Sequence, residues 1–529
     1  MRRAILLGAI AVCAATGAAV GLAADKNGFT TAHPSMLTGV APGSTVKPII
    51  TVDDTLGGGY RFESIPDGIA LDARGQGRLD VYVNHETSTV PFPYGPGAAP
   101  EANQNDFDNA QLSRLALSQK SAGVLNAKLV IESSANYQRF CSSYLATAAE
   151  GFDRELLFMN EEATDFVYRT GRAWPAPASE PPAEQAGVVV AYDVRTGKYR
   201  TIYGMGRHNH ENSVAIPGFD DLVVLSGDDT FTSNPAQSQL YSYIAPDADA
   251  VWNDTGRLYG FRVDNPAVND YYDIPVGSTA SYPGTFVPID PAAAKGTQTA
   301  LENASDAAGV FQFVRLEDIA YDKRPGMSNV VYVADTGRGS ASTSGNAFAS
   351  TNGRIWKLVF TDPDDPTKAT LSLLVEGDDA PLKTVNEIHQ PDNLETTAAG
   401  SLMVTEDPGS GQQFPVGSTD PAATTARLWW MKLDTGAKTV AAKVDQSGDE
   451  GPTDVDAAPA GNLGAWESSG VVDASAVYGP GSFFVTIQAA TLWLEKEIVA
   501  PADDPGPLKY GFTKKRSGGQ LVLLRVPGA

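Results

Sequence analysis

Short apolar runs that end in a polar or acidic residue recur along this chain and constrain its fold more than any other feature. There are six: VYVNHE (81–86), LLFMNEE (156–162), VVLSGDD (223–229), VYVADT (331–336), LMVTED (402–407) and FFVTIQ (483–488). About one strand length earlier, most are preceded by a second acidic landmark, in PDGIALD (66–72), HENSVAI (210–216), LEDIAYD (316–322), PDNLETT (391–397) and ESSGVVD (467–473). The chain therefore carries an internal repeat of strand-forming units.

The length of one repeat predicts the architecture. Successive repeats lie roughly 70 residues apart, whereas one four-stranded blade of a β-propeller needs about 40 to 50 residues. The sequence therefore predicts an all-β fold, a β-propeller with long loop insertions. Composition agrees, because 52 Gly and 35 Pro residues and few long helical periodicities favour an all-β chain over an α/β chain.

Repetition also predicts a site. Equivalent positions in successive blades lie on a ring around one axis. Asp67, Glu211, Glu317, Asp392 and Glu467 occupy such positions and should converge on a central channel. Carboxylates crowded into a partly dry site repel one another and take up protons unless cations are bound among them. We therefore predict that the channel is a metal site.

The sequence divides into three parts. Residues 1–24 contain Arg2-Arg3 and an apolar stretch that ends in small residues, which is the pattern of a signal peptide. Residues 25–58 form a leader segment, and residues 59–529 are expected to form a single propeller domain. We expect an exported protein, periplasmic or extracellular, and the Sec and twin-arginine routes are both open.

Several segments lie outside the repeat. Those at 231–310, 340–352 and 497–517 are predicted to be surface loops, the first two over the channel mouth. The final strand, 518–526, has no obvious partner nearby in the sequence. We expect it to pair with N-terminal strand residues and so close the ring of blades.

The charge of the chain excludes some partners. Its formal net charge is −24, with 63 acidic and 39 basic residues, so its long-range field repels nucleic acids and anionic membranes. Beyond the signal peptide, no segment approaches the length of a membrane span. We expect a monomer without a nucleic-acid partner. An anionic substrate would require bound metal, or placed Arg and Lys residues, to invert the field at the site.

Cys141 is the only cysteine that remains once a signal peptide containing Cys13 is removed. An unpaired cysteine is a liability in an oxidising compartment unless it is buried or liganded. Taken alone, this residue fits either a small apolar side chain in a core strand or a metal ligand.

Longer motifs follow one another in a fixed order. They are PDGIAL with NHE, FCSSYLA with FMNEE, GRHNHENSVA with SGDDT, FVRLEDIAYD, QPDNLETTAAGSLMVTEDPG and ESSGVVDASAVYGPGSFFVTIQ. In this order, over about residues 60 to 490, the chain resembles the PhoX family of bacterial alkaline phosphatases and its relatives without an assigned function. The resemblance implies a six-bladed β-propeller that hydrolyses phosphate monoesters at a mixed cluster of iron and calcium in its channel.

The resemblance also assigns residues. By position in the motifs, Cys141, Glu162, Glu211 and Glu317 match ligands of the iron pair, and thiolate and carboxylate groups suit iron. As one match in an ordered set, Cys141 becomes a predicted ligand.

Calcium takes hard oxygen donors. At matching positions of the repeat, the candidates are Asp67, Asp392, Asn393, Asp407 and Glu467. The alternative is that Asp in Pro-Asp-Gly or Pro-Asp-Asn only caps a turn. Neighbouring acids share this ambiguity, namely Glu86, Glu161, Asp228 and Asp229.

Arg315 and His210 are the predicted catalytic residues. The resemblance implies that Arg315 grips substrate phosphate, and a guanidinium group suits that task, but a salt bridge to a nearby carboxylate is an equal alternative. Four of the five histidines fall in or beside the repeat motifs, which favours channel-lining roles for some. They are His85, His208, His210 and His389.

One departure weakens the catalytic inference. The family carries a histidine directly after the glutamine of its last motif, whereas Ala489 and Ala490 follow Gln488 here. Two alternatives therefore stay open: a calcium-stabilised propeller that binds a partner without catalysis, and another calcium-dependent propeller hydrolase of the phytase or lactonase type.

Overall fold

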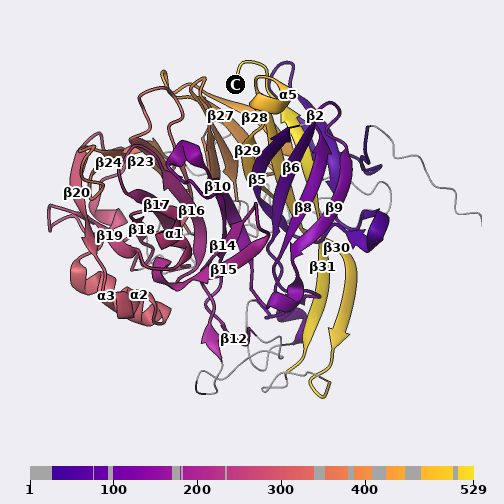
Figure 1. Ribbon diagram of the computed structural model, residues 1–529, viewed down its shortest axis with the longest axis horizontal. Coiled ribbons are helices and arrows are strands. Elements are labelled where there is room, and N and C mark those ends of the chain that lie inside the picture. Colours follow the sequence, from indigo (N-terminus) through magenta and orange to yellow (C-terminus); the bar gives the residue numbers. More distant parts are fainter. Residues whose placement is uncertain are drawn as a thin grey trace, which may run out of the picture.

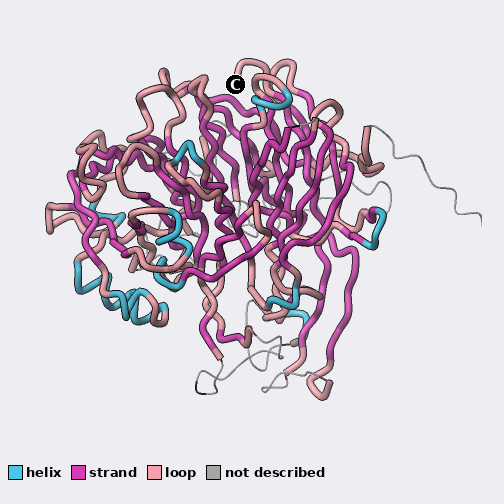
Figure 2. The backbone as a smooth tube through the Cα atoms, in the orientation of Figure 1, coloured by secondary structure: helices cyan, strands magenta, loops and turns pink. Residues whose placement is uncertain are grey.

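The computed structural model describes residues 27–75, 77–92, 99–169, 179, 183–232, 235–338, 352–378, 387–407, 424–446, 466–503 and 510–529. Strands dominate these ranges, and short helices lie between them (Figure 2). The helices are α1 (Ala248–Trp252), α2 (Pro291–Ala294), α3 (Gln298–Ala308) and α5 (Ser475–Tyr478). The predicted all-β fold is confirmed. None of the described helices has the length and apolar character needed to cross a membrane.

Five sheets of four or more strands form the described body (Figure 1). The first contains β5 (Pro66–Gly75), β6 (Arg78–His85), β8 (Gln111–Ser118) and β9 (Val124–Ile131). The second contains β10 (Phe140–Ala146), β11 (Leu156–Glu161), β14 (Val189–Asp193) and β15 (Lys198–Ile202). Both are antiparallel meanders whose first strand carries a motif of the sequence repeat.

The third sheet is larger and has nine strands. Its first part contains β16 (His210–Ile216), β17 (Leu222–Asp228), β18 (Leu240–Ala245), β19 (Arg257–Val263) and β20 (Ser281–Pro288). Its second part contains β21 (Leu316–Tyr321), β22 (Val330–Asp335), β23 (Arg354–Phe360) and β24 (Lys368–Glu376). Strand β20 pairs with both β19 and β24 and so joins two meanders into one sheet. Six separate blades are therefore not confirmed.

The last two large sheets recruit strands from the N-terminal segment. One contains β25 (Pro391–Thr396), β26 (Ser401–Glu406), β27 (Arg427–Lys432), β28 (Lys438–Val444) and β1 (Leu37–Gly39). The other contains β29 (Glu467–Asp473), β30 (Ser482–Val499), β31 (Phe512–Arg525), β2 (Thr45–Thr51) and the short β7 (Gln104–Asp106). Two small hairpins complete the described strands: β3 (Thr55–Leu56) with β4 (Tyr60–Arg61), and β12 (Phe166–Val167) with β13 (Glu184–Gln185).

The loop predictions need two corrections. Residues 231–310 are not a surface loop, because they supply β18, β19 and β20 as well as three helices. Residues 497–517 contain the end of β30 and the start of β31, which pair as a long hairpin. The predicted signal peptide, 1–24, and nearly all of loop 340–352 lie outside the described residues.

The last strand closes the ring as expected. Strand β31 pairs with β2, and Thr45 lies opposite Arg525 while Ile50 lies opposite Leu521. In Figure 1 the yellow β31 accordingly lies beside indigo strands from the start of the chain. Strand β31 also pairs with β30, so the sequence analysis was wrong that it lacks a nearby partner.

Interior strands face two hydrophobic cores at once. In β17, Val223 and Leu225 pack in one cluster around Trp356, whereas Val224 packs in another with Leu156 and Tyr241. Successive side chains of a strand point to opposite faces, so the sheet is buried on both sides. This explains why these strands appear in the sequence as continuous apolar runs without alternation.

Every strand that opens a meander carries a β-bulge at the same place. The register shifts fall between residues 66 and 69, 140 and 143, 210 and 213, 316 and 319, 391 and 394, and 468 and 471. The bulged pairs are Asp67-Gly68, Cys141-Ser142, Glu211-Asn212, Glu317-Asp318, Asp392-Asn393 and Ser469-Gly470. A bulge breaks the alternation of side chains and so redirects two neighbours.

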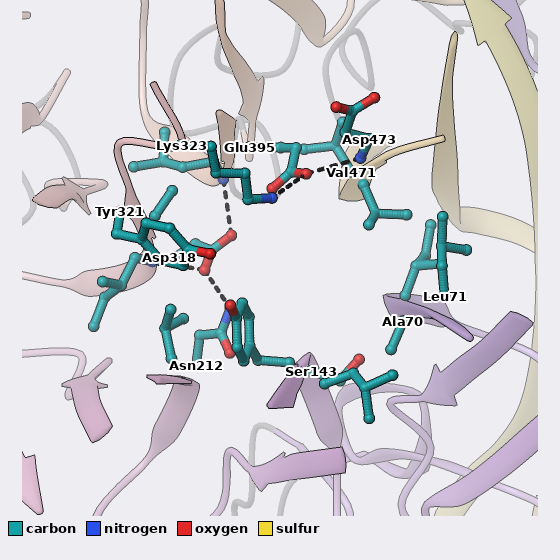
Figure 3. A pocket seen from close by; sticks show the side chains of 18 of the residues that line it. Ala70, Leu71, Ser143, Asn212, Asp318, Tyr321, Lys323, Glu395, Val471 and Asp473 are labelled. Atoms are coloured by element: carbon teal, nitrogen blue, oxygen red, sulfur yellow. Dashed lines mark hydrogen bonds and ion pairs between the residues drawn. The ribbon is translucent and has the colours of Figure 1, made fainter. Parts of the chain in front are cut away.

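Two cavities lie along these six strands. The central cavity, of about 750 Å³, is lined by first bulge residues such as Asp67, Cys141 and Glu317. A second cavity, of about 240 Å³, is lined mostly by residues that follow the bulges, and all six strands contribute to it (Figure 3). The six opening strands therefore surround one common space.

The second bulge residues form a packed layer between the two cavities. The Asn212 amide donates to Asp318 Oδ1, and Asn393 Nδ2 donates to Ser142 Oγ at 2.7 Å. At Gly68, a Cβ atom would lie less than 3.0 Å from backbone atoms of residues 141–143. Glycine is thus required there by the close approach of a neighbouring strand.

Replacing this glycine should destabilise the fold. We expect Gly68→Ala to lower the free energy of unfolding by about 1–3 kcal/mol, because the added methyl group must push two strands apart. The matched control is Gly57→Ala, where a Cβ would meet nothing within 4 Å. Denaturant titration measures both variants, and equal stabilities would contradict the packed layer.

Candidate metal centre

Two sets of polar side chains lie in or beside the central cavity. Each set corresponds to one of the two landmarks of the sequence repeat. The first set comprises the first bulge residues of the opening strands: Asp67, Cys141, Glu211, Glu317, Asp392 and Ser469. The second set comprises the residues after the ends of the partner strands: Glu86, Glu162, Asp229, Thr336 and Asp407, with Gln488 as the equivalent in β30. The fold therefore brings together residues that are hundreds of positions apart.

Three overlapping groups could each hold a cation. Within each group, one ligand atom per residue lies within 4.8 Å of the others. The groups are Asp67, Glu86 and Cys141; Cys141, Glu162 and Glu211; and Glu211, Glu317 and Asp392. Because Cys141 and Glu211 are each shared by two groups, the donors form one continuous row. Six of the seven predicted metal ligands belong to this row.

The seventh predicted ligand, Glu467, lines the same cavity but has a different position in the repeat. The bulge of β29 falls at Ser469, two residues later, so Ser469 is the equivalent of Asp67. Its hydroxyl donates to Asp67 Oδ1 at 2.7 Å. The sequence alignment of the ESSGVVD segment with the other motifs was therefore shifted by two residues.

The carboxylates of the row are in an environment that disfavours their charge. Burial, followed by repulsion from neighbouring carboxylates, raises the pKa of Glu162 and Glu211 well above the usual value. Burial and the nearby Asp67 raise the pKa of Glu86 to about 8. Bound cations would restore the charged forms of all three.

Cys141 lies at the centre of the row. Its thiol is buried and donates to Asp67 Oδ2, with Sγ 3.0 Å from that oxygen. Burial and then the surrounding carboxylates raise the pKa of the thiol well above the usual value. A thiolate at this position therefore requires a metal ion beside it.

The donor set fits a mixed group of cations. One carboxylate oxygen of Glu211, Oε1, accepts a hydrogen bond from Ser142 Oγ at 2.5 Å. The other, Oε2, is buried and has no hydrogen bond of normal geometry in the described part of the chain, although the nearby Cys141 thiol favours its charge. A thiol surrounded by oxygen donors suits iron, and the group of oxygen donors alone suits calcium.

Where two acids follow one another, the structure separates their roles. Glu161 is fully buried and forms two hydrogen bonds with the Arg169 guanidinium, at 2.7 and 2.8 Å. It also accepts from the backbone N–H groups of residues 138, 187 and 188. Its neighbour Glu162 lines the central cavity. The first acid therefore stabilises a strand end and the second is a candidate ligand.

The same division recurs in another sheet. Glu406 accepts from Arg427 Nε at 2.9 Å and from the backbone N–H of His389, whereas Asp407 lines the cavity. Sequence analysis left Glu86 and Glu161 equally ambiguous. The strand register separates the two kinds of acid. Glu161 and Glu406 lie opposite Phe140 and Pro391, the residues that precede a bulge, whereas the candidate ligands follow one position later.

Arg315 lies at the wall of the cavity and is paired with carboxylates. Its Nε and Nη2 donate to the two oxygens of Asp229 at 2.8 and 2.7 Å. Its Nη2 also lies 2.6 Å from Glu317 Oε1, and its Nη1 lies 3.4 Å from Asp407 Oδ2. In this structure the guanidinium group is therefore paired with three acids of the site, and its role in gripping substrate phosphate stays a prediction.

The structure does not bring His210 to the cavity. Its Nδ1 lies 2.9 Å from Ser226 Oγ and its Nε2 lies 3.1 Å from the Gly206 carbonyl oxygen. Burial lowers its pKa to about 4, so it is neutral at physiological pH. None of the four histidines near the motifs is among the described residues that line the central cavity. The catalytic role predicted for His210 has no support in this geometry.

The sequence analysis considered Gln488 only because the family's histidine does not follow it. In the structure, its side chain bridges two acids of the first group of donors. Its Nε2 donates to Asp67 Oδ2 and to Glu86 Oε2, each at 2.9 Å. Asn393, a predicted calcium ligand, instead takes part in the layer between the cavities.

The two acids of the Glu161-Glu162 pair should respond differently to the same change. We expect Glu161→Gln to lower the free energy of unfolding by about 3 kcal/mol, because Arg169 loses its charged partner in a buried setting. Glu162→Gln should keep the fold and lose bound metal. Thermal unfolding and elemental analysis measure both, with the exposed Glu497→Gln as control. Equal stabilities of the two variants would contradict the division of roles.

Removal of metal should make stability depend on pH. Because the folded-state pKa of Glu86 is about 8 against a usual 4.5, the metal-free folded state holds protons that the unfolded state releases. Its stability should therefore fall as the pH rises from about 4.5 through 8. We expect the thermal midpoint in chelator to fall more steeply over this range than that of the metal-loaded protein. Parallel curves would show that no cation occupies the row.

Comparison with known proteins identifies the family. A family model described as alkaline phosphatase PhoX matches residues 182–443. No curated protein sequence matches the chain significantly. The solved structure of Pseudomonas fluorescens PhoX in complex with vanadate, a transition-state analogue, is similar with a TM-score of 0.56 and 16% identity, over 95% of this chain and 98% of that one. At this identity the likeness shows a shared fold.

Looser likenesses extend to other proteins. A Penicillium chrysogenum α-L-arabinanase complexed with arabinobiose has a TM-score of 0.38 and 9% identity, over 90% of this chain and 98% of that one. The NanB sialidase from Streptococcus pneumoniae has a TM-score of 0.38 and 8% identity, over 88% and 70%. These two likenesses carry no argument about this chain. The family model and the ordered motifs agree with each other, and the chain belongs to the PhoX family.

Proposed function

We propose that the protein is an exported, metal-dependent phosphatase that hydrolyses phosphate monoesters at a cluster of iron and calcium in the central cavity. One observation carries the proposal: in a chain of the PhoX family, a thiol and six buried or half-buried carboxylates form a continuous row of donors. Water would be the nucleophile, so no serine or threonine nucleophile is needed, and bound cations would supply Lewis acidity toward the phosphoryl oxygens.

The residues of the row would hold two kinds of cation. Cys141, Glu162, Glu211 and Glu317 would hold iron, because thiolate and carboxylate are suitable ligands for it. Asp67, Asp392 and Glu467 would hold calcium through oxygen donors. With the row occupied, the local field at the cavity would attract an anion, although the whole protein carries a net charge of −24.

The cavity also has room for the organic part of an ester. Its volume is about 750 Å³, and Phe92, Phe231 and Trp493 line it together with the acids. These aromatic rings give part of the cavity wall an apolar surface that an organic group can contact. A range of organic leaving groups can thus be accommodated above the donor row.

The activity and the metals can be tested together. Protein expressed with its export signal should release phosphate from an aryl phosphate at alkaline pH and lose that activity with chelator. Elemental analysis should find iron and calcium. Cys141→Ser should lose iron and activity while calcium stays bound, because only the soft donor is removed. Calcium without iron or turnover would favour the non-catalytic binding module.

Export has its own test. The mature protein recovered from the periplasm or medium should begin near Ala24, as measured by intact mass. Retention of residues 1–24 in the cytoplasm would contradict the proposed location.

A further inference from the structure

We propose that the site prefers phosphate esters whose alcohol part carries a flat, uncharged aromatic ring, and that Phe92, Phe231 and Trp493 form the wall that contacts this ring. The inference rests on the proposed phosphatase function and narrows its substrate class. It depends on where the three rings lie relative to the donor row and on how each ring is held.

The three rings come from three different sheets but have similar positions in the sequence repeat. Each follows, by a few residues, the member of the second set of polar side chains from its own part of the chain. The pairs are Glu86 with Phe92, Asp229 with Phe231, and Gln488 with Trp493. All three rings line the central cavity. Strand β30 continues past Gln488 in the long hairpin at the lower edge of Figure 1, so Trp493 lies beyond the donor row.

Phe92 exposes apolar surface although its position is fixed. The residue is 56% exposed. Its backbone N–H donates to the Gln104 carbonyl oxygen at 2.7 Å, and its ring centre lies 6.1 Å from that of Phe231. The Cζ atom of Arg139 lies 5.1 Å from the centre of the same ring. A large ring that is held in place and left uncovered gives a ligand apolar surface to bury.

Trp493 is half-buried and is held by its own hairpin. Its Nε1 donates to the Ala490 carbonyl oxygen at 3.2 Å, and the Nζ of Lys496 lies 4.9 Å from its ring centre. The N–H group of the indole is therefore already used within the protein. Trp493 contributes aromatic surface to the cavity wall in place of a hydrogen-bond donor.

A side branch of the cavity brings the aromatic wall next to the donor row. The branch has a volume of about 160 Å³. Glu86 and Glu162 of the row line it, together with Phe92, Phe231 and Val90. An ester whose phosphoryl group meets the row can thus place its organic part directly against two of the rings.

The basic side chains of the branch already have acidic partners. Arg139 Nη1 lies 2.9 Å from Asp165 Oδ2, and Lys515 Nζ lies 3.8 Å from Asp106 Oδ1. An uncharged leaving group leaves these pairs undisturbed. A flat ring can also adopt offset or edge-to-face contacts with the wall, whereas a saturated group of equal size gains only from the burial of its surface.

Two esters that differ in the flatness of one ring test the preference. They are benzyl phosphate and cyclohexylmethyl phosphate, which release primary alcohols of nearly equal size. With the metal-loaded, mature wild-type protein, we expect kcat/KM to be about tenfold higher for the benzyl ester, because aromatic contacts add to the effect of burial.

Substitutions locate the preference on the wall. Phe92→Leu and Trp493→Leu keep an apolar side chain but remove a ring, and each should reduce the preference about threefold with unchanged metal content. Trp493→Phe keeps a ring and should retain most of the preference. The matched control is Trp252→Leu on α1, where the Arg154 Cζ lies 4.0 Å from the ring centre and the side chain is not among the described residues that line the cavity.

Equal kcat/KM values for the two esters in the wild type would overturn the inference. A preference that stays unchanged in both Phe92→Leu and Trp493→Leu would also overturn it, because the selectivity would then come from another part of the site.

A second pair of substrates distinguishes two sources of the ring. Adenosine 5′-monophosphate and ribose 5-phosphate differ by the base alone. A preference for the nucleotide that Trp493→Leu reduces would support a nucleobase as the ring. Equal values for this pair, with the benzyl preference retained, would support a ring bonded close to the ester oxygen.

Calorimetric titration with benzylphosphonate and cyclohexylmethylphosphonate, which cannot be hydrolysed as esters, separates this inference from the proposed function. If the wild type binds the benzyl compound more tightly through these rings but hydrolyses no ester, the phosphatase proposal fails and the inference about the wall stands. If the wild type hydrolyses both esters equally well and binds both phosphonates equally well, the inference fails alone. If neither turnover nor binding is detected, both fail.

Discussion

Space at the channel axis is the constraint on which the rest of the structure depends. Six strands meet there, and each carries a bulge at the same place. The second residue of each bulge is either too small to collide, as Gly68 is, or bonded to a neighbour, as Asn393 is. Because this layer is packed, the side chain of the first residue of each bulge is held on the side of the central cavity. The backbone therefore sets the positions of the donors in the row.

Charge is distributed around this layer in two ways. Glu161 and Glu406 are buried, but each is matched by an arginine and by backbone N–H groups. Glu162 and Glu211, which belong to the donor row, lack comparable compensation and are destabilised as anions by burial. The acids that stabilise strand ends therefore have arginine and N–H partners for their negative charge. The acids that would bind a cation have fewer such partners.

The sequence predicted the class of fold and the convergence of distant acids, because both follow from repetition. It placed Asp67, Cys141, Glu211, Glu317 and Asp392 around one space, and the structure brings them there. It could not reveal the bulges, since a one- or two-residue change of register leaves no mark in composition. Glu467 was therefore equated with the wrong position, where Ser469 stands.

Other errors had different causes. Residues 231–310 are rich in small polar residues typical of loops, yet tertiary pairing makes strands of them and joins two meanders through β20. His210 lies within a motif, but its ring bonds inward to Ser226 and Gly206. Proximity in sequence to a ligand does not determine which way a side chain faces.

The pairing of β2 with β31 has a consequence for biosynthesis. One sheet needs residues from near both ends of the chain, and that sheet supplies Ser469 and Gln488 to the wall that holds Asp67. These residues are synthesised after the early acids, so Asp67 lacks part of its surroundings until the strands that carry Ser469 and Gln488 have been made. A cation held by Asp67 and Glu86 would accordingly be captured late in maturation, after β2 and β31 have paired.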